Sequence, residues 1–524
     1  MDVLISNLRI PIEEDGITAY LNSASQSLNI NESNLTFKKI LSKSLHTSNT
    51  EQFYYNLSIV VSTDDRFDNK DNFPIYCEPI KTSKKSITRK ERPIVIGFGP
   101  AGMFAALELL EFGLQPLIFE RGKKIEERMI DVQRFVRERV LDPESNIQFG
   151  EGGAGSYSDG KLFSRMKNSE YVSKVLDTFI KFGAPEELGY VNKPHIGTDV
   201  LCRIVKNVRN YILERGGEIQ YNSKMTDVLI EDGKAFGVVI NGKEEYHSSM
   251  IFLAVGHSAR DTFEMIHNKG IALEQKPISV GLRIEHPAET INLLRYGKKY
   301  KNFPGLGAAT YSLNYTNRKL KRGVYTFCMC PGGEIVNASS EQGMMALNGM
   351  SYSRRSSAFS NSALVVTCHT SDYPSASPLA GIEFQREIER KVFHASGGRW
   401  EVPAQNLPDF LDGNISKDLN KNSYAMGAVA VPLSELLPLF VSDMLVAAFQ
   451  SWKEEYPLFV SEEAILFGAE TRTSSPVKMK RSDNYESVSI KNLYPIGEGS
   501  GYTGGITSSA ADAIKAVEHA VATH

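Results

Sequence analysis

The sequence has few long apolar runs, few cysteines and little excess charge. No uninterrupted apolar stretch approaches the roughly 18 residues of a membrane-spanning helix, and the start lacks the basic and apolar segments of a signal peptide. The five cysteines are scattered and odd in number, which argues against a disulfide framework. The net charge of −3 gives no global sign of a nucleic-acid or anionic-membrane partner. We therefore expect a cytoplasmic protein in a reducing setting, without a membrane partner.

A chain of 524 residues has room for two to four domains, at roughly 100–200 residues each. Alternating and periodic apolar positions predict a βαββ unit over residues 1–80, with strands at 3–11, 35–45 and 53–61 and a helix at 17–28. Residues 81–92 form a basic linker, which is either a phosphate-attracting segment or a solvated hinge.

From residue 93 the sequence predicts strands and helices that alternate along the chain. This alternation is lost between about 270 and 460. Hairpin-like runs at 323–333 and 361–368 predict a mainly antiparallel sheet there. We expect a cofactor domain over 93–270 that is completed by 461–524, with residues 271–460 inserted as an α+β substrate domain.

A glycine turn follows the first apolar strand of the α/β region. The run Gly97-Phe98-Gly99-Pro100-Ala101-Gly102 lies between a strand and a helix that ends near Gly113. Its first glycine permits a tight turn, the second lets the backbone approach a pyrophosphate, and the third lets helix and sheet pack closely. The helix N-terminus offers free N–H groups to phosphate, and Glu120 at the end of the next strand can accept hydrogen bonds from ribose hydroxyls.

Two later segments indicate which dinucleotide is bound. Residues 493–496 read as a strand that leads into Gly497 and Glu498, and Gly504-Gly505-Ile506 opens an alanine-rich helix. This arrangement resembles the second FAD motif of the glutathione-reductase-type flavoproteins, with Glu in place of the usual Asp. The strand end at Ala254-Val255-Gly256 resembles a third segment of those proteins. The resemblance implies FAD, with the helix N-terminus at the flavin.

The loop over residues 146–162 combines many glycines with hydroxyl, acid and amine groups. Such a loop can present amides to a flat ring or a pyrophosphate. Arg128 lies nearby in sequence and is either a phosphate ligand or a surface residue. We expect cofactor contacts from this region at Arg121, Arg128, Gly152, Gly153, Ala154, Gly155, Ser158 and Asp159.

Taken together, these strings resemble a family of bacterial FAD-dependent dehydrogenases. The most specific are Phe149–Leu162 and Cys328-Met-Cys-Pro-Gly-Gly333, supported by Lys193–Asp199, Gly256–Asp261, Gly281–Pro287 and Glu470–Pro476. The resemblance covers nearly everything after residue 90. It implies an FAD domain split by a substrate domain, plus a small N-terminal domain, and it implies no particular substrate.

Several charged and imidazole side chains within these strings are candidates for chemistry. Lysine or arginine could stabilise reduced flavin or orient an anionic substrate, and histidine could act as a general acid or base. The catalytic candidates are Lys161, His195, His257, Arg283 and His286, with Arg260 as a further cofactor contact.

Cys328 and Cys330 are separated by one residue, whereas a redox dithiol usually has two residues between its cysteines. We interpret them as packed thiols of the inserted sheet, and no cysteine and histidine set indicates a metal.

No second glycine turn of the strand-to-helix type occurs, so we expect NAD(P)H, if it is the electron donor, to bind transiently at the flavin.

The leading hypothesis is a dehydrogenase or reductase that acts on a small molecule. A flavin monooxygenase is the alternative within enzymes. An RNA-associated flavoprotein, with the N-terminal unit and linker as the RNA-binding part, is the alternative from another class. The sequence does not indicate an oligomeric state.

Overall fold

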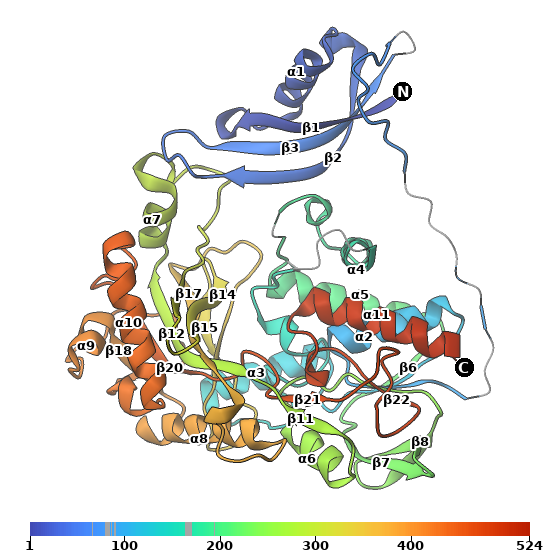
Figure 1. Cartoon of the computed structure of the whole chain (residues 1–524), viewed down its shortest axis with the longest axis vertical. Coiled ribbons are helices and arrows are strands. Elements are labelled where there is room, and N and C mark those ends of the chain that lie inside the picture. Colours follow the sequence, from blue (N-terminus) through green and yellow to red (C-terminus); the bar gives the residue numbers. More distant parts are fainter. Residues whose placement is uncertain are drawn as a thin grey trace.

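The computed structural model describes residues 1–64, 67–78, 84, 86–87, 91–162, 170–192 and 194–523. Most of the expected linker at 81–92, and Lys193 of the family-like string, lie outside these ranges. Figure 1 shows a small unit at the N-terminus above a larger body built around two sheets. Within the described residues, no helix is both long and apolar enough to cross a membrane.

A five-stranded parallel sheet forms the core of the α/β part. Its order is β22 (Leu493–Pro495), β10 (Ile251–Leu253), β4 (Ile94–Ile96), β5 (Leu117–Phe119) and β6 (Glu218–Gln220). The middle strands are fully buried apolar triplets, as expected for a parallel sheet covered on both faces. Because β22 comes from the far end of the chain, the segment between β10 and β22 is an excursion from this sheet.

Helices cover one face of this sheet, and a small sheet covers the other. The first face carries α2 (Pro100–Glu111), α4 (Glu170–Lys181), α5 (Thr198–Glu214) and α11 (Ile506–Thr523). Helix α2 begins with proline at its first position, and its C-cap Phe112 is followed by Gly113, whose φ is +79°. The second face carries β7 (Met225–Glu231), β8 (Lys234–Ile240), β9 (Glu244–His247) and α6 (Arg260–Asn268). The expected helix end at Gly113 is confirmed.

The excursion contains a seven-stranded sheet. Its order is β13 (Asn314–Asn317), β14 (Arg322–Cys330), β17 (Phe359–Cys368), β12 (Ile278–Pro287), β20 (Ile465–Glu470), β18 (Val402–Asn406) and β19 (Ala428–Ala430). All pairs are antiparallel except β18 with β19. Strand β20 lies between β12 and β18, so the sheet continues beyond the boundary expected at residue 460.

Helices and short strands complete the excursion. The helices are α7 (Ala288–Tyr300), α8 (Ala380–Ala395), α9 (Leu407–Asp412) and α10 (Leu439–Glu455), and their apolar sides share one core with the sheet. Strands β15 (Glu334–Asn337) and β16 (Leu347–Met350) pair with each other. Strands β11 (Leu273–Gln275) and β21 (Val477–Met479) pair where the chain leaves and re-enters the α/β part.

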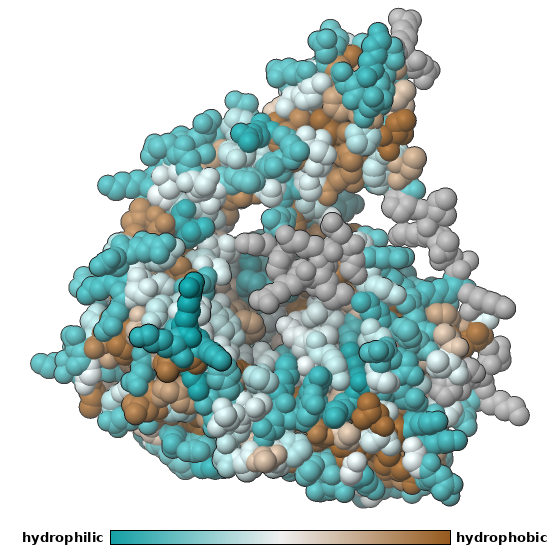
Figure 2. Space-filling model, in the orientation of Figure 1, coloured by the Kyte–Doolittle hydropathy of each residue, from teal (hydrophilic) through white to brown (hydrophobic). Residues whose placement is uncertain are grey.

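The N-terminal unit has the order β1 (Asp2–Pro11), α1 (Ile17–Leu28), β2 (Leu35–His46) and β3 (Tyr54–Thr63), with β3 in the centre of its sheet and a core of its own. This unit contacts the rest of the protein through Phe53 and Lys43, among other described residues. The Phe53 ring stacks on the Tyr300 ring of α7, with 4.3 Å between the ring centroids, and the Lys43 backbone N–H donates to the carbonyl oxygen of Tyr190. Figure 2 shows a mostly hydrophilic face, with apolar side chains in separate areas.

Helix α3 (Ile125–Glu138) leads into the glycine-rich loop and completes the body. The carboxyl ends of β4, β10 and β22 meet at one edge of the parallel sheet, beside the seven-stranded sheet. That edge is where open α/β sheets bind ligands.

Candidate functional site

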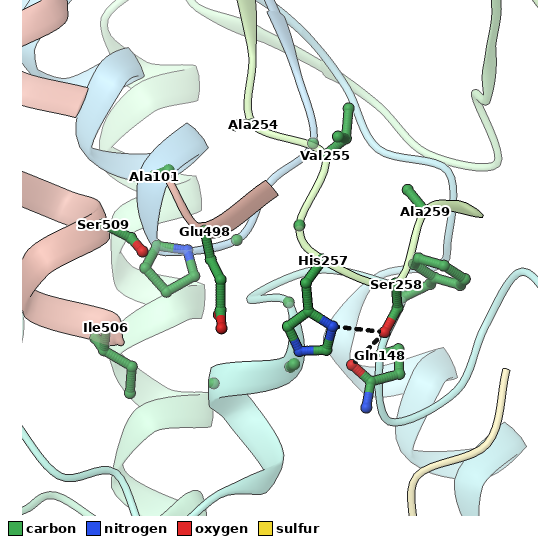
Figure 3. Close-up of a pocket in the computed structure, with 18 of the residues that line it drawn as sticks. Ala101, Gln148, Ala254, Val255, His257, Ser258, Ala259, Glu498, Ile506 and Ser509 are labelled. Atoms are coloured by element: carbon green, nitrogen blue, oxygen red, sulfur yellow. Dashed lines mark hydrogen bonds between the residues drawn. The ribbon is translucent and has the colours of Figure 1, made fainter. Parts of the chain in front are cut away.

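A cavity of about 340 Å³ lies at this edge, within the range typical of small-molecule sites. Its walls come from the turn after β4, the loop after β10, the glycine-rich loop at 148–161, the start of α11 and the end of β14. Figure 3 shows Glu498 and His257 pointing into the same space, with Ile506 and Ser509 of α11 on one side.

Most of the residues expected at a cofactor line this cavity: Gly97, Gly99, Pro100, Ala101, Glu120, Arg121, Gly153, Ala154, Gly155, Ser158, Asp159, Ala254, Gly256, Glu498, Gly504, Gly505 and Ile506. Of the catalytic candidates, Lys161 and His257 line it. The other predicted residues lie outside its lining: Gly102, Arg128, Gly152, Gly497, Arg260, His195, Arg283 and His286.

The glycine turn is held tightly against its neighbours. A Cβ on Gly97, whose φ is +95°, would lie 2.4 Å from the Ala254 oxygen, and one on Gly102 would lie 1.9 Å from the Gly97 oxygen. A Cβ on Gly153 would lie 2.9 Å from the Gly99 Cα. The two glycine segments therefore approach each other through bare backbone, which leaves amides rather than side chains at the cavity wall.

Glu120 is almost fully buried, and most of its acceptor capacity is used within the protein. Its carboxylate accepts hydrogen bonds from the backbone N–H groups of Phe98, Gly122 and Gly150, at 2.8, 2.9 and 3.0 Å. An ionised carboxylate has about four acceptor positions, so one position is left for a ligand hydroxyl. The hydrogen bonds of Glu120 thus link the glycine turn to the glycine-rich loop.

The expected phosphate contact of Arg128 is replaced by a structural role. Its guanidinium is fully buried and donates to the carbonyl oxygens of Asn146, Ile147 and Glu151, each at 2.8 Å. These bonds hold the glycine-rich loop in its shape. Arg121 lines the cavity, but it pairs with Asp261 and Glu144 and lies over the Phe149 ring at 4.0 Å.

Glu498 is the acid expected before α11, and its carboxylate faces the cavity (Figure 3). Burial raises its pKa to about 7, an effect that Lys276 opposes. Among the described residues, this carboxylate has no hydrogen-bond or ion-pair partner. A buried acid in this position is suited to hydroxyl donors of a ligand.

The three histidines expected to act as acids or bases do not titrate near neutral pH. His286 is fully buried on β12 and contacts the Phe459 oxygen through Nε2 at 2.8 Å; burial lowers its pKa to about 4. His195 lies outside the cavity lining, and burial with Arg355 lowers its pKa to about 4. His257 is at the cavity, where burial and Arg472 lower its pKa to about 3. Burial therefore favours the neutral imidazole in all three, and of the three His257 is the one that lines the cavity.

Arg260 and Arg472 share one buried acid, Glu389. Arg260 binds Glu389 at 2.8 Å and also contacts Glu341. Arg472, which sequence reasoning did not single out, lines the cavity and meets the same Glu389 at 3.0 Å. This pairing orients Arg472, whose guanidinium also reaches Ser258, the neighbour of His257.

Arg283 lies beneath the cavity rather than in it. It binds Glu470 at 2.8 Å, and another of its nitrogens donates to the Cys328 carbonyl oxygen at 2.8 Å. Glu470 itself lines the cavity, and burial raises its pKa to about 7 against the effect of Arg283. The sequence string Glu470–Pro476 contained this acid, but nothing in the string marked it as facing a ligand.

Cys328 also lines the cavity, so the expectation of two packed thiols is wrong for one of them. Strand β14 has an irregularity between Phe327 and Cys330, and Cys328 adopts a φ of +44°. This bulge turns Cys328 toward the cavity while Cys330 remains fully buried. Two-residue alternation in an ideal strand would have placed both thiols on one face.

The cavity fits FAD by three features. Bare glycine backbone lines it at Gly99 and Gly153, the first turns of α2 and α11 both open onto it, and the Glu498 carboxylate faces it unpaired among the described residues. Helix N-termini suit the pyrophosphate and the electron-rich edge of the ring, while a buried carboxylate suits sugar-like hydroxyls.

Comparison with known proteins agrees with this fit. Residues 277–473 match the C-terminal domain of FAD-dependent proteins. An uncharacterised protein of Clostridium beijerinckii is 41% identical over 532 residues, covering 99% of each chain. The chain belongs to the same family as this clostridial protein. Its cofactor is FAD, as the sequence predicted.

Solved structures with a likeness to this FAD-dependent protein include a geranylgeranyl bacteriochlorophyll reductase-like protein of Thermoplasma acidophilum, at 12% identity and a TM-score of 0.35 over 82% of this chain and 79% of that one. CtdE in complex with FAD has 12% identity and a TM-score of 0.30 over 82% and 83%. A flavocytochrome c3 fumarate reductase has 12% identity and a TM-score of 0.31 over 82% and 78%.

Proposed function

We propose that the protein is an FAD-dependent dehydrogenase or reductase that transfers hydride or electrons between FAD and a small-molecule substrate. The main support for this proposal is that two helix N-termini, two glycine loops and the wall of the seven-stranded sheet meet at the same cavity. The cofactor side comes from the parallel sheet. The sheet of the excursion supplies the opposite wall, where a substrate would lie.

The AMP half of FAD would be held at the carboxyl ends of β4 and β5. Glu120 offers its remaining acceptor position to one ribose hydroxyl. The backbone amides at Gly99–Ala101 and Gly153–Gly155 would meet the pyrophosphate. This is the manner of the glutathione-reductase-type flavoproteins, whose second FAD motif the segment around Gly497–Ile506 resembles.

The flavin half would lie toward the start of α11. Glu498 would accept from the ribitol hydroxyls, and the α11 N-terminus at Gly504–Ile506 would stabilise negative charge at the pyrimidine edge. When bound, the flavin supplies hydride or single-electron transfer.

Charged side chains of the chain would orient the substrate and move its protons. Lys161 is at the cavity, where Asp159 holds its Nζ at 2.8 Å, and Arg472 is fixed by Glu389. Both can bind an anionic group of a substrate. Glu470, with a pKa of about 7, can give or take a proton near neutral pH, and it replaces the histidines in that role. NAD(P)H would enter the same cavity transiently as an electron donor.

An anaerobic reduction experiment tests this proposal. Purified holoprotein is mixed with NADH, NADPH and a panel of small hydroxy, carbonyl and amino metabolites while the flavin absorption is followed. We expect at least one of them to bleach the flavin, and Glu470→Gln to slow that bleaching by about tenfold or more with unchanged flavin content. A protein that contains no flavin, even after reconstitution with FAD, would overturn the proposal.

A further inference from the structure

The end of β14 brings a strained cysteine, a second thiol and two cations together at the cavity. Cys328 is not glycine, asparagine or aspartate, yet it has a left-handed backbone. Such a conformation is unfavourable for a residue with a Cβ and persists where the surroundings impose it. It exposes this thiol to the cavity, next to Phe327 and Asn348, which also line it.

Cys330 lies directly behind Cys328. Its thiol donates a hydrogen bond to the Cys328 carbonyl oxygen at 3.3 Å. Arg283 approaches from below, with one nitrogen 2.8 Å from the Cys328 oxygen and 3.5 Å from the Cys330 Sγ. The two sulfurs are therefore neighbours, and only one of them faces the cavity.

The two thiols are placed to share one proton. Lys161 donates to the carbonyl oxygen of Met329, between the two cysteines, so a second cation lies beside the pair. The hydrogen bond from Cys330 and the cations Lys161 and Arg283 lower the pKa of Cys328, whereas burial raises the pKa of Cys330. An accessible thiolate with a protonated partner behind it is the arrangement of an attacking and a resolving cysteine.

We propose that Cys328 and Cys330 are a redox-active pair that exchanges thiols with a small disulfide bound in the cavity. The Cys328 thiolate attacks one sulfur of the disulfide, forms a mixed disulfide and releases one thiolate. Cys330 then attacks the Cys328 sulfur, forms the Cys328–Cys330 bond and releases the second thiolate. The pair loses two electrons and the ligand gains them. The one proton that the pair holds leaves Cys330 as it attacks and passes to a released thiolate or to water. The reverse exchange with two thiols regenerates the pair.

This inference goes beyond the proposed function, because thiol–disulfide exchange by the two cysteines is a reaction separate from flavin reduction. The experiment therefore measures released thiolate and the state of the cysteines, not flavin absorption. The probe is 5,5′-dithiobis(2-nitrobenzoate), an aromatic disulfide whose released thiolate is coloured. The holoprotein carries Cys77→Ser, which removes the exposed cysteine. Trypsin would give one peptide, Gly323–Arg354, that contains both Cys328 and Cys330 and no other cysteine.

We expect two coloured thiolates per chain in a fast phase. The peptide should then be lighter by two hydrogen atoms and carry no aromatic adduct. With Cys330→Ser, one thiolate should be released and one adduct should stay on Cys328; with Cys328→Ser, the fast phase should be lost. The matched control is Cys368→Ser, which removes a buried thiol whose pKa burial raises to about 12, and it should leave the fast phase unchanged.

The fast phase at neutral pH should exceed the reaction of Cys202 and Cys368 by at least about tenfold. Flavin content and circular dichroism establish that each variant is folded. The proposal is overturned if folded Cys328→Ser keeps the fast phase, or if the wild-type peptide carries two adducts in place of an internal disulfide. Neither result bears on whether the protein binds FAD.

Discussion

FAD affinity should depend on pH through Glu498. Burial holds the pKa of this carboxyl at about 7 in the ligand-free protein. Hydroxyl donors of a bound ribitol chain stabilise the ionised form, so binding lowers the pKa. A ligand that lowers a pKa binds more tightly as pH rises through the free-state value. We therefore expect FAD to bind more tightly above pH 7 than below it.

The magnitude follows from the type of hydrogen bond. A bond to a charged group contributes about 1.5–3 kcal/mol, and about 1.4 kcal/mol is a factor of ten in affinity. Glu498→Ala should therefore weaken FAD binding by about 10- to 150-fold at pH 8. Glu498→Gln keeps an acceptor without the charge, so its loss should be about fivefold, with little dependence on pH.

The assay is fluorescence titration of the apoprotein with FAD between about pH 5.5 and 8.5. Glu285→Gln is the matched control, because burial also raises the pKa of Glu285 to about 7, but this acid binds Ser423 and does not line the cavity. The control should keep the wild-type pH dependence. A Glu498→Gln protein that shows the same pH dependence as the wild type would refute the reasoning.

Three further substitutions test the site. Gly97→Ala should abolish flavin binding, since its Cβ would meet backbone oxygen at 2.4 Å, whereas Gly233→Ala, at a φ of +71° with open space around it, should keep full flavin content. Arg128→Met leaves three buried carbonyl groups without donors and should lower the free energy of unfolding by about 3 kcal/mol or more. Arg134→Met, at an exposed ion pair, should change it by about 0.5 kcal/mol or less. Urea unfolding measures the free energy of unfolding of both variants. His286→Gln should leave the rate of flavin reduction within about twofold of wild type, and a loss of reduction with normal flavin content would restore His286 as a catalytic candidate.

The cofactor-binding elements could be predicted from the sequence because their conformation depends on residues close together in the chain. A strand, a tight turn and a helix in succession require glycine at fixed positions, and these glycines lie where such a turn demands them. The strands and the helix of residues 1–63 also follow from apolar alternation and helical periodicity.

The substrate side was less accessible because long-range packing decides it. Whether Arg128 meets a phosphate or a loop carbonyl depends on a contact some twenty residues away, and the sequence does not fix that contact. The bulge that separates Cys328 from Cys330 breaks the two-residue alternation on which their placement was based. The acid Glu470 faces the cavity only because β20 pairs with β12 in the centre of the sheet.

A crystal structure with FAD would test the central claim most directly. We expect the pyrophosphate at the amides of Gly99–Ala101, the ribitol hydroxyls at Glu498 and the flavin ring at the start of α11, facing the end of β14. FAD bound elsewhere on the molecule, or a cavity that stays empty at saturating FAD, would contradict the account.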